Sequence, residues 1–527
     1  LNSASEGDLH FCRIEVRLSD AELGNRPMGQ RLDLVLDLEY MPRVPLYRRL
    51  SDALRKAILD GRLLPGQPMP SIRDLSLSQK VSRATVIKAF DDLNSQGLIE
   101  SKTGSGTFVC TTLPGDMADM IASLPKTFKT RNLDSIKVSN YSKRLLSLAG
   151  DYERYIEHSK KGNFFAPPPE LVPLKRWKGL LMDYVRSNDS RAIDQDGDPF
   201  GYRPLRQEIA SLLKRRRGVE CDPDRVVVFG AKQGRLDIIL KILTRPGDEV
   251  VFEEPGYTEA RLTFQAYGAQ IIPVPVDQFG IKIDALPQFS ENVKAAYVTP
   301  SRQDPTGATL PLERRKELLL WAAENHSFIF EDDTDSEYRY GVPLVPSLQS
   351  LDQNDCVVYI ASFWKVLFPV LNFGFAVIPE RLKNLMMKAK IILDRYMPLP
   401  EQYVLARFIG DGYLEKCIKK NNSIYALRKQ RLALALGRYF GDKISFTPST
   451  AGTQQLVNID SPLSDPEIEN LAANCSFPVV STAPHYMHEP SKGEFIIPFL
   501  SLEPYSIDRM VERWALSLLE AEARCLE

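Results

Sequence analysis

The strongest constraint on the fold is a change of pattern along the chain. Residues 41–110 consist of short amphipathic segments separated by glycine and proline, whereas after about residue 164 apolar strand-like runs alternate with helical segments. A length of 527 residues exceeds what one ordinary core supports, so about two to four domains are expected. The sequence therefore predicts a small helical domain followed by a large α/β domain.

Composition narrows the class of protein further. With 43% hydrophobic and 26% charged residues the chain is typical of a globular protein, and no apolar run approaches the roughly 18 residues of a membrane span. The first residues lack the basic and apolar parts of a secretion signal, so we expect a cytoplasmic protein without membrane contact. The seven cysteines form no CxxC pair, which predicts neither a disulfide framework nor a metal site.

Charge is distributed unevenly along the chain. The whole chain carries −1, but residues 41–110 contain eleven Lys or Arg and six Asp or Glu, which leaves +5 there and −6 elsewhere. A basic module on an acidic body is typical of a protein whose first domain contacts phosphate groups. A helical face that only contacts water would give the same local excess of positive charge.

The basic module has the pattern of a winged helix-turn-helix. Residues 45–60 carry apolar side chains at helical spacing, at Leu46, Leu50, Leu54, Ile58 and Leu59. The run GRLLPGQPMP ends that helix, and Ser71 can cap a second helix that extends to Gln79. A third helix is expected over 83–96, with Val86, Phe90 and Leu93 facing inward. LIESKTGSGTFV then predicts a two-stranded wing, in which Gly104 and Gly106 allow a tight turn.

The start of the third helix is the part expected to contact DNA. Ser82, Arg83 and Thr85 lie at the end that would enter a major groove, where an arginine can bind guanine and hydroxyls can bind phosphate. Lys88 lies one turn further on. Periodicity alone leaves a second interpretation open, a three-helix packing module with solvated basic residues.

The order of the residues favours the DNA-binding interpretation. PLYRRLSDALRKAILDGRLLPGQPMPSIRDL and VSRATVIKAFDDLNSQGLIESKTGSGTFV closely resemble the DNA-binding domain of the GntR family. By this resemblance DNA-contacting positions fall on Arg73, Ser82, Arg83, Thr85 and Gly106. Ile87 stands where several relatives have a basic residue, so the half-site sequence is expected to differ.

The body resembles a second family. The strings GDPFGYRPLRQEIASLLKRRRGVECDPDRVVVFGAKQG, VVFEEPGYTEAR, VTPSRQDPTGATLP, FIFEDDTDSEYRY and YIASFWKVLFPVLNFGFAVIP follow the order found in fold-type I aminotransferases. With the preceding module, they resemble the MocR-type subgroup of GntR regulators. This resemblance implies a pyridoxal 5'-phosphate site formed by Ala231, Lys232, Tyr257, Asp304, Asp332, Thr334, Ser362 and Lys365.

The residue types agree with that chemistry. Gly230 to Gly234 can turn a strand into a helix whose N–H groups face a phosphate, and Tyr257 can stack on a pyridine ring. Asp332, after the apolar run FIF, can hold the pyridine nitrogen protonated. Lys365 is the candidate Schiff-base lysine, if burial and a neighbouring positive charge expose its amine.

Several positions depart from the aminotransferase pattern. Asn372 replaces a phosphate-binding arginine, Trp364 a serine, and Thr334 a tyrosine that bonds the ring hydroxyl. Asp304 replaces an asparagine and Val370 a glycine, and FIIPFLSLEP lacks the arginine that would bind a substrate carboxylate. Losing one charge-assisted phosphate contact costs about 1.5–3 kcal/mol. Compensating positive charge is available from Lys232, Arg235 and Arg302.

The sequence therefore predicts a MocR-like transcriptional regulator. Its parts are an unassigned extension over 1–40, a winged helix-turn-helix over 41–110, a linker over 111–162 and an aminotransferase-like domain over 163–527. The expected partners are double-stranded operator DNA, a second copy of the chain in a homodimer, and a small-molecule effector such as an amine or amino acid. An aminotransferase with an appended DNA-binding domain and a ligand-blind DNA-binding dimer remain alternatives; the missing arginines and tyrosine argue against full enzymatic turnover.

Overall fold

The computed structural model describes residues 44–102, 105–111, 137–150, 153, 165–186, 197–230, 232–342, 345–447 and 449–526. The chain divides into two compact units, with the division after Ile136. The predicted extension over 1–40 lies outside the described residues, as does Ala231. Among the described residues no helix is both long enough and apolar enough to cross a membrane.

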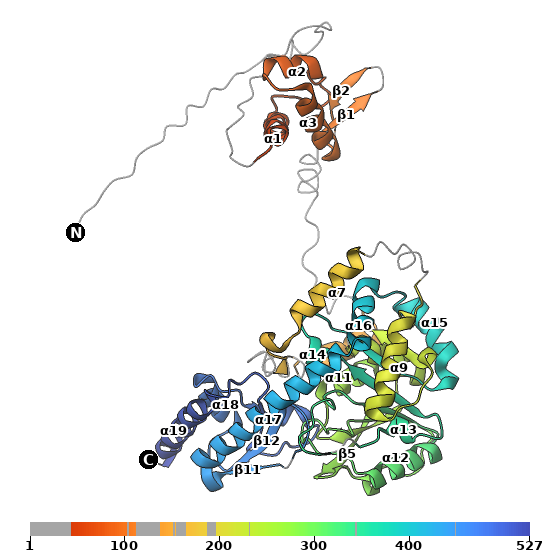
Figure 1. Cartoon of the computed structure of the whole chain (residues 1–527), viewed down its shortest axis with the longest axis vertical. Coiled ribbons are helices and arrows are strands. Elements are labelled where there is room, and N and C mark those ends of the chain that lie inside the picture. The colour runs from red at the N-terminus through yellow and green to blue at the C-terminus, as the bar shows by residue number, and fades with distance from the viewer. Residues whose placement is uncertain are drawn as a thin grey trace, which may run out of the picture. The chain divides into compact units, whose positions relative to one another are not determined.

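The first unit is a winged helix-turn-helix, as predicted (Figure 1). Its elements are α1 (Leu46–Leu59), α2 (Ile72–Ser78), α3 (Arg83–Ser95), β1 (Ile99–Lys102) and β2 (Gly106–Val109). The two strands pair antiparallel, from Ile99 opposite Val109 to Lys102 opposite Gly106. The predicted cap of α2 is confirmed, because the Ser71 hydroxyl accepts the N–H of Asp74 at 3.1 Å.

The core of this unit joins all three helices to the wing. Leu50, Leu54 and Ile58 of α1 meet Val86, Phe90 and Leu93 of α3, and Val109 of the wing closes the cluster. Two apolar residues of the helical pattern, Leu46 and Leu59, are exposed because they lie at the two ends of α1, beyond the partners that cover its middle.

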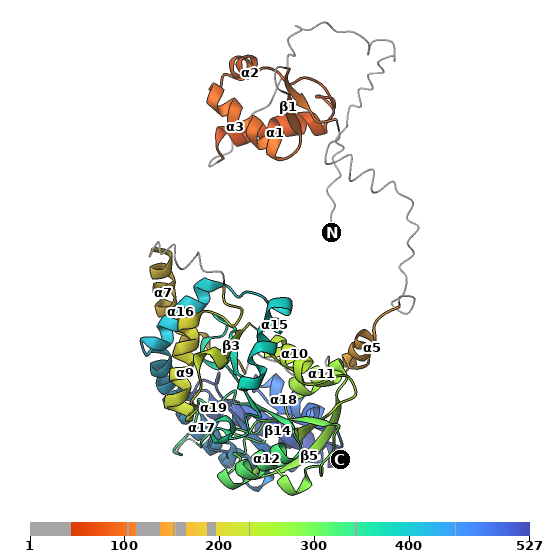
Figure 2. The same cartoon turned by 90° about the vertical axis from the view of Figure 1, so that its right-hand side faces the viewer.

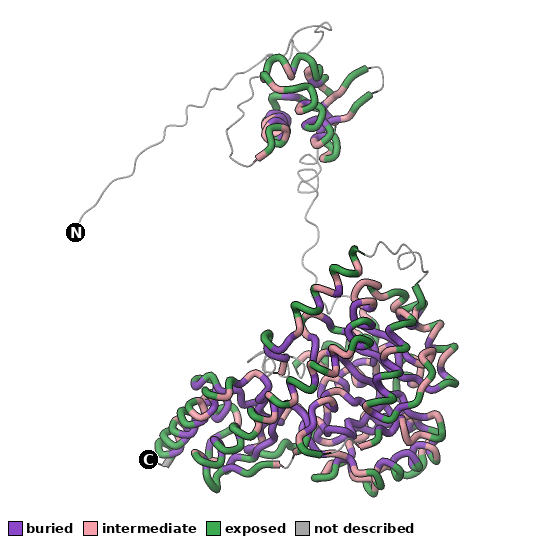
Figure 3. Tube along the Cα trace, viewed as in Figure 1, coloured by how far each residue is buried: buried purple, intermediate pink, exposed green. Residues whose placement is uncertain are grey.

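The second unit is built on an eight-stranded mixed sheet in the order β3-β10-β9-β8-β7-β4-β5-β6. The strands are β3 (Val226–Phe229), β4 (Glu249–Glu254), β5 (Gln270–Asp277), β6 (Gly280–Ile281), β7 (Val293–Val298), β8 (Phe328–Asp332), β9 (Val357–Ser362) and β10 (Gly374–Val377). From β5 to β9 neighbouring strands are parallel, whereas β10 runs antiparallel to both β3 and β9. These central strands are almost continuously apolar because both faces of the sheet are buried (purple in Figure 3).

Helices cover both faces of this sheet. On β9, Val358 and Ile360 belong to one apolar cluster and Tyr359 and Ala361 to another on the opposite face. The helices of this region are α7 (Leu174–Arg186), α9 (Arg203–Arg217), α10 (Lys232–Leu243), α11 (Thr258–Tyr267), α12 (Leu312–Glu324), α13 (Leu348–Leu351), α14 (Trp364–Leu367), α15 (Lys383–Leu393) and α16 (Leu399–Gly410). The predicted α/β arrangement is confirmed.

The C-terminal part forms a smaller second layer of structure (blue in Figure 1). The long helix α17 (Tyr413–Phe440) leads to a four-stranded antiparallel sheet in the order β11-β12-β14-β13. Its elements are β11 (Ile444–Phe446), β12 (Gln454–Ile459), β13 (Val480–Ser481), β14 (Glu494–Pro498), α18 (Asp465–Asn474) and α19 (Ile507–Leu526). Trp514 of α19 is fully buried and packs against Phe440 and Phe477.

One helix of the predicted linker packs on the second unit. Helix α5 (Asn140–Ser147) lies beside α11 (Figure 2), and Arg144 donates to the carbonyls of Ala266 at 2.9 Å and Tyr267 at 2.6 Å. A cation on the last carbonyls of a helix is favoured by the helix dipole. Helix α5 therefore holds the last turn of α11, the helix that precedes β5.

Candidate functional site

The first candidate surface is the exposed face of α3 together with the wing. Arg73, Arg83 and Lys88 are exposed, and among the described residues none of the three pairs with a carboxylate. Gly106 is also exposed and has φ +106°, a backbone conformation that favours glycine. These basic groups are free to meet phosphate or base edges, which is the arrangement that the sequence predicted.

Ser82 and Thr85 have a second role that the sequence analysis did not assign. Ser82 is the N-cap of α3, and its hydroxyl accepts the Thr85 N–H at 3.1 Å. The two hydroxyls also lie 2.8 Å apart. Because these groups order the first turn of α3, they fix the direction of Arg83, the next residue after the cap.

The second candidate site is a cavity of about 460 Å³ in the body, a size typical of small-molecule sites. It lies at the carboxyl ends of the parallel strands β4, β7, β8 and β9, where ligands bind in open α/β sheets. Six predicted cofactor residues line it: Tyr257, Asp304, Asp332, Thr334, Ser362 and Lys365. Ala231 lies outside the described residues, and only the backbone of Lys232 is described.

Lys365 lies on the short helix α14 and is 7% exposed. Its Nζ is 3.3 Å from Asp335 Oδ2, and it donates to the Phe165 carbonyl at 3.1 Å and to Thr453 Oγ1 at 3.3 Å. The closest charged group is therefore a carboxylate, and a positive charge also lies near, because Arg302 Nη1 is 4.0 Å from the same Asp335 oxygen. Asp335 was not predicted, although it lies within the acidic run EDDTD that drew attention to Asp332.

The half of the cavity expected to hold a pyridine ring agrees with the prediction. Asp332 ends β8, is buried, and accepts hydrogen bonds from Tyr297 Oη and from Thr334 N and Oγ1, the last two at 3.0 and 2.5 Å. Tyr257 is the residue before α11 and lines the same cavity, where its hydroxyl donates to Glu259. A buried carboxylate and an aromatic face suit a protonated heterocycle.

Among the described residues, the half expected to hold a phosphate lacks two polar groups of the family pattern. Asn372 and the indole of Trp364 line the wall where the family has an arginine and a serine. The Ser362 hydroxyl accepts the Trp364 N–H at 3.1 Å and donates to the Phe373 carbonyl at 3.4 Å. A phosphate dianion needs cationic or N–H donors. In the predicted phosphate loop the described wall offers Gln233, whose side-chain N–H donates to Glu259 at 2.5 Å.

The compensating cations do not supply this charge among the described side chains. Arg235 is fully buried in α10, donates to the Ala361 carbonyl at 2.8 Å, and does not line the cavity. Arg302 does line the cavity, but its Nη1 lies 3.2 Å from Asp304 Oδ1 and 4.0 Å from Asp335 Oδ2. The positive charge of Arg302 is therefore offset by two carboxylates.

The C-terminal layer adds residues that the sequence analysis missed. Gln454 donates to Asp304 Oδ1 at 3.2 Å, and His485 Nδ1 lies 3.9 Å from Asp304 Oδ2. Burial lowers the pKa of His485, which favours the neutral ring. These residues follow Asp304 by 150 and 181 positions, and no local motif marks them. Only the packing of the two layers places them in the cavity.

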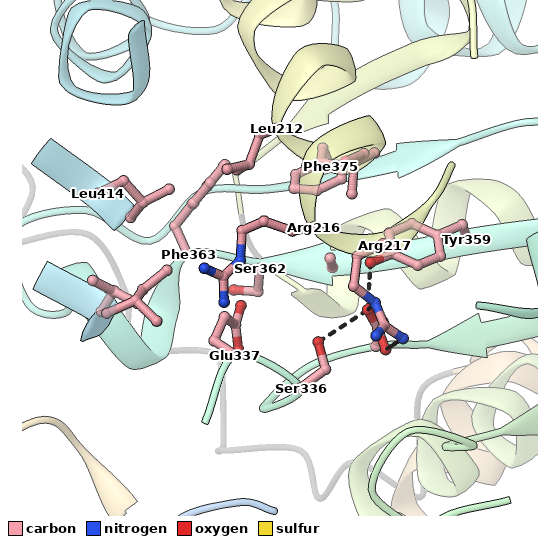
Figure 4. Close-up of a pocket in the computed structure, with 15 residues that line it drawn as sticks. Leu212, Arg216, Arg217, Ser336, Glu337, Tyr359, Ser362, Phe363, Phe375 and Leu414 are labelled. Carbon is pink, nitrogen blue, oxygen red and sulfur yellow. Dashed lines mark hydrogen bonds and ion pairs between the residues drawn. The ribbon is translucent and has the colours of Figure 1, made fainter. Parts of the chain in front are cut away.

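Ser362 also lines a second, smaller pocket (Figure 4). Its volume is about 50 Å³, enough for one or two water molecules but not for a metabolite. Arg217 and Asp333 form a buried ion pair at 2.6 Å there, and Tyr359 donates to the same carboxylate at 2.5 Å. We therefore infer that the residues around this pocket hold the 332–337 segment in place.

Comparison with known proteins identifies both units. The model for bacterial regulatory proteins of the gntR family matches residues 46–109, and the model for aminotransferase class I and II matches residues 168–476. Together these matches decide the family. The chain belongs to the MocR type of GntR regulator, with a class I and II aminotransferase body. The resemblance seen in the sequence is confirmed.

Relatives of this MocR-type chain include regulators and enzymes. It is 29% identical to the probable rhizopine catabolism regulatory protein MocR of Rhizobium meliloti, covering 93% of this chain and 97% of the relative. It is 28% identical to the pyridoxine biosynthesis regulator PdxR of Corynebacterium glutamicum, over 77% and 82% of the two chains. A multiple substrate aminotransferase from Thermococcus profundus superposes with a TM-score of 0.62 at 25% identity, covering 68% of this chain and 91% of that one. The body of the MocR-type chain thus has a fold-type I aminotransferase fold.

Proposed function

We propose that this MocR-type chain is a transcriptional regulator whose first unit binds double-stranded operator DNA and whose body binds a small-molecule effector. One observation carries the proposal: a winged helix-turn-helix, whose Arg83 and Lys88 are exposed and have no carboxylate partner among the described residues, is linked to a body with a ligand-sized cavity. The net charge of +5 in residues 41–110 supports the DNA assignment, because it favours contact with a polyanion.

We further propose that the body forms a homodimer. Helix α15 and the segment after it expose large apolar side chains, which are costly to leave in water, at Leu385, Ile391, Ile392, Leu393 and Tyr396. A twofold pair of bodies would bring two DNA-binding units to repeated half-sites. The effector would act by binding one arrangement of the dimer more tightly than another.

Pyridoxal phosphate on Lys365 remains a prediction from the family fold. The ring half of the cavity supports it, whereas Trp364, Asn372 and Glu259 argue against a bound phosphate. If the cofactor binds, the purified protein should show a visible absorbance band when pyridoxal phosphate is added, and the band should depend on Lys365. The Lys365→Ala variant is the matched control for that spectrum.

Operator binding tests the proposed function directly. An operator can be selected from random duplexes with the full chain, and its affinity then measured by fluorescence anisotropy over a range of salt concentrations. Arg83→Ala is expected to weaken specific binding by about 1–3 kcal/mol if its side chain reads a base edge. The affinity of the Arg83→Ala variant for DNA duplexes of random sequence should be nearly unchanged.

Arg245→Ala is the control for this experiment. Arg245 is an exposed arginine of the body, so its removal changes net charge by the same amount. Equal operator affinity for the Arg83 variant and the unaltered protein would show that α3 is not the reading helix. Failure to enrich any duplex would overturn the DNA-binding proposal itself.

A further inference from the structure

The outer face of helix α17 carries charge of one sign only. Five charged side chains are exposed along this helix, and all five are cations: Lys416, Lys419, Lys420, Arg431 and Arg438. We call these five residues the basic stripe. The helix lies at the surface of the body (Figure 1). Because the chain outside residues 41–110 has a net charge of −6, the stripe is a basic region on an acidic body.

Most cations of the basic stripe have no carboxylate to neutralise them. Within the stripe, and among the described residues, only Arg438 forms an ion pair, with Asp508 at 3.2 Å. Lys416 lies three and four residues before Lys419 and Lys420, spacings at which like charges repel on one face of a helix. A helix that contacts only water more often alternates acids and bases at these spacings. An anion bound along α17 would remove the repulsion.

Neighbouring helices extend the positive surface at the start of α17. Arg176 of α7 and Lys416 both lie against the ring of Tyr413, at 4.0 and 5.2 Å from its centre. In the last turn of α9, Arg215 is exposed and lies 3.4 Å from Glu415. Carboxylates partly offset the two arginines, so the unpaired charge is concentrated on the stripe itself. Tertiary packing of three helices thus gathers cations that are distant in the sequence.

The length of the basic stripe suits duplex DNA. Lys416 and Arg438 lie about 33 Å apart along the axis of α17, because an α-helix rises about 1.5 Å per residue. One turn of B-DNA is about 34 Å long. A row of cations on a rigid helix can therefore follow the phosphates of a duplex over about one turn.

We propose that the basic stripe of α17 is a second DNA-binding surface, with which the body contacts phosphates of the duplex that the first unit recognises. The stripe binds charge and leaves the reading of sequence to α3. DNA is favoured over other polyanions because the first unit would hold a duplex on the same chain, which raises the local concentration of phosphate. The inference rests on the proposed function, since it requires a DNA-bound chain.

The salt dependence of DNA binding by the full chain tests this proposal. The probe is a duplex in which the selected operator is flanked on both sides by random sequence. Lys416→Gln, Lys419→Gln and Lys420→Gln are combined in one stripe variant. Each lost phosphate contact removes about 0.9 from the slope of log K against log salt concentration, so we expect the slope to become shallower by about 2–3. Affinity at low salt should fall at least tenfold.

A matched control variant combines Arg245→Gln, Lys316→Gln and Lys492→Gln, which removes three positive charges from exposed positions on other elements of the body. Its slope should equal that of the unaltered protein. Equal slopes for the stripe variant and the unaltered protein, or equal losses in the two variants, would overturn the proposal. Thermal melting shows that both variants fold. If the stripe variant melts early, Lys419→Gln alone provides the second test, with a slope change of about 0.9.

Two further outcomes separate this proposal from its alternatives. Vesicles of phosphatidylglycerol that bind the full chain but not the stripe variant, together with an unchanged DNA slope, would make the stripe a membrane surface and overturn the proposal. Failure to enrich any duplex contradicts the proposed function. A selected operator that both proteins bind with the same slope contradicts this inference alone.

Discussion

At the scale of single residues, Ile87 has an unusual position for an apolar side chain. It is 45% exposed on α3, one turn from Arg83 and next to Lys88. A free apolar side chain on a reading helix cannot form the hydrogen bonds that distinguish guanine or adenine. It can contact the methyl group of thymine in the major groove.

We therefore predict that Ile87 selects a thymine. Replacing that thymine by deoxyuridine, which lacks the methyl group, should cost the unaltered protein about 1 kcal/mol of binding free energy. In Ile87→Ala the same replacement should change affinity little, so the two effects are not additive. Anisotropy titrations on the selected operator give all four values. A full penalty for deoxyuridine in the variant would exclude this contact.

Glu253 is a residue whose protonation should appear in stability. It is buried at the end of β4, where desolvation raises its pKa to about 7, and its Oε2 accepts bonds from Thr299 and Gln303. The folded protein therefore holds a proton that the unfolded chain releases near pH 4.5. Between these values the folded state binds more protons, so the free energy of unfolding falls as pH rises.

We predict that Glu253→Gln reduces this pH dependence. Between pH 4.5 and pH 7, the free energy of unfolding should fall in both proteins. The fall should be smaller in the variant than in the unaltered protein, by up to about 3 kcal/mol. Glu331, also buried with a pKa raised to about 7, acts in the same direction in both proteins and cancels in the comparison. Chemical denaturation at a series of pH values measures the difference. Parallel pH profiles would contradict the assignment.

At the scale of elements, α11 joins the cavity to the linker. Its first turn carries Glu259 at the cavity wall, and Thr258 donates to the Pro484 carbonyl at 2.9 Å across to the C-terminal layer. Its last carbonyls are held by Arg144 of α5. Helix α5 follows closely after the division between the two units. A shift of α11 would therefore reach α5.

We predict that Arg144→Ala releases α5 from α11. The variant loses two charge-assisted hydrogen bonds. Each such bond contributes about 1.5–3 kcal/mol when buried, and the contribution is smaller here because Arg144 is partly exposed. Hydrogen exchange should accelerate in residues 140–147 and 264–268 and remain unchanged in the central sheet. Lys143→Ala, an exposed neighbour on the same helix, is the control. Unaltered exchange in Arg144→Ala would show that the contact does not hold the linker helix.

At the scale of the whole molecule, each unit has a core of its own. Among the described residues, the apolar cluster of the first unit lies between Leu50 and Cys110, and those of the second begin at Leu171. Separate cores unfold separately unless an interface couples them. Calorimetry should therefore resolve two transitions. A ligand bound in the cavity of the body should raise only the transition of the body, because a ligand stabilises the unit that binds it.

The sequence by itself determined the elements and the edge at which the site forms. Cap residues, helical spacing and short apolar runs are local signals, so Ser71, the α3 face and the strands around Asp332 and Lys365 were predictable. The charges that meet in the cavity were decided by tertiary structure. Asp335 turns toward Lys365 through a left-handed backbone, and Gln454 and His485 arrive from a layer that no local pattern connects to the sheet. Electrostatic environment depends on distances between remote segments, and those distances exist only in the folded chain.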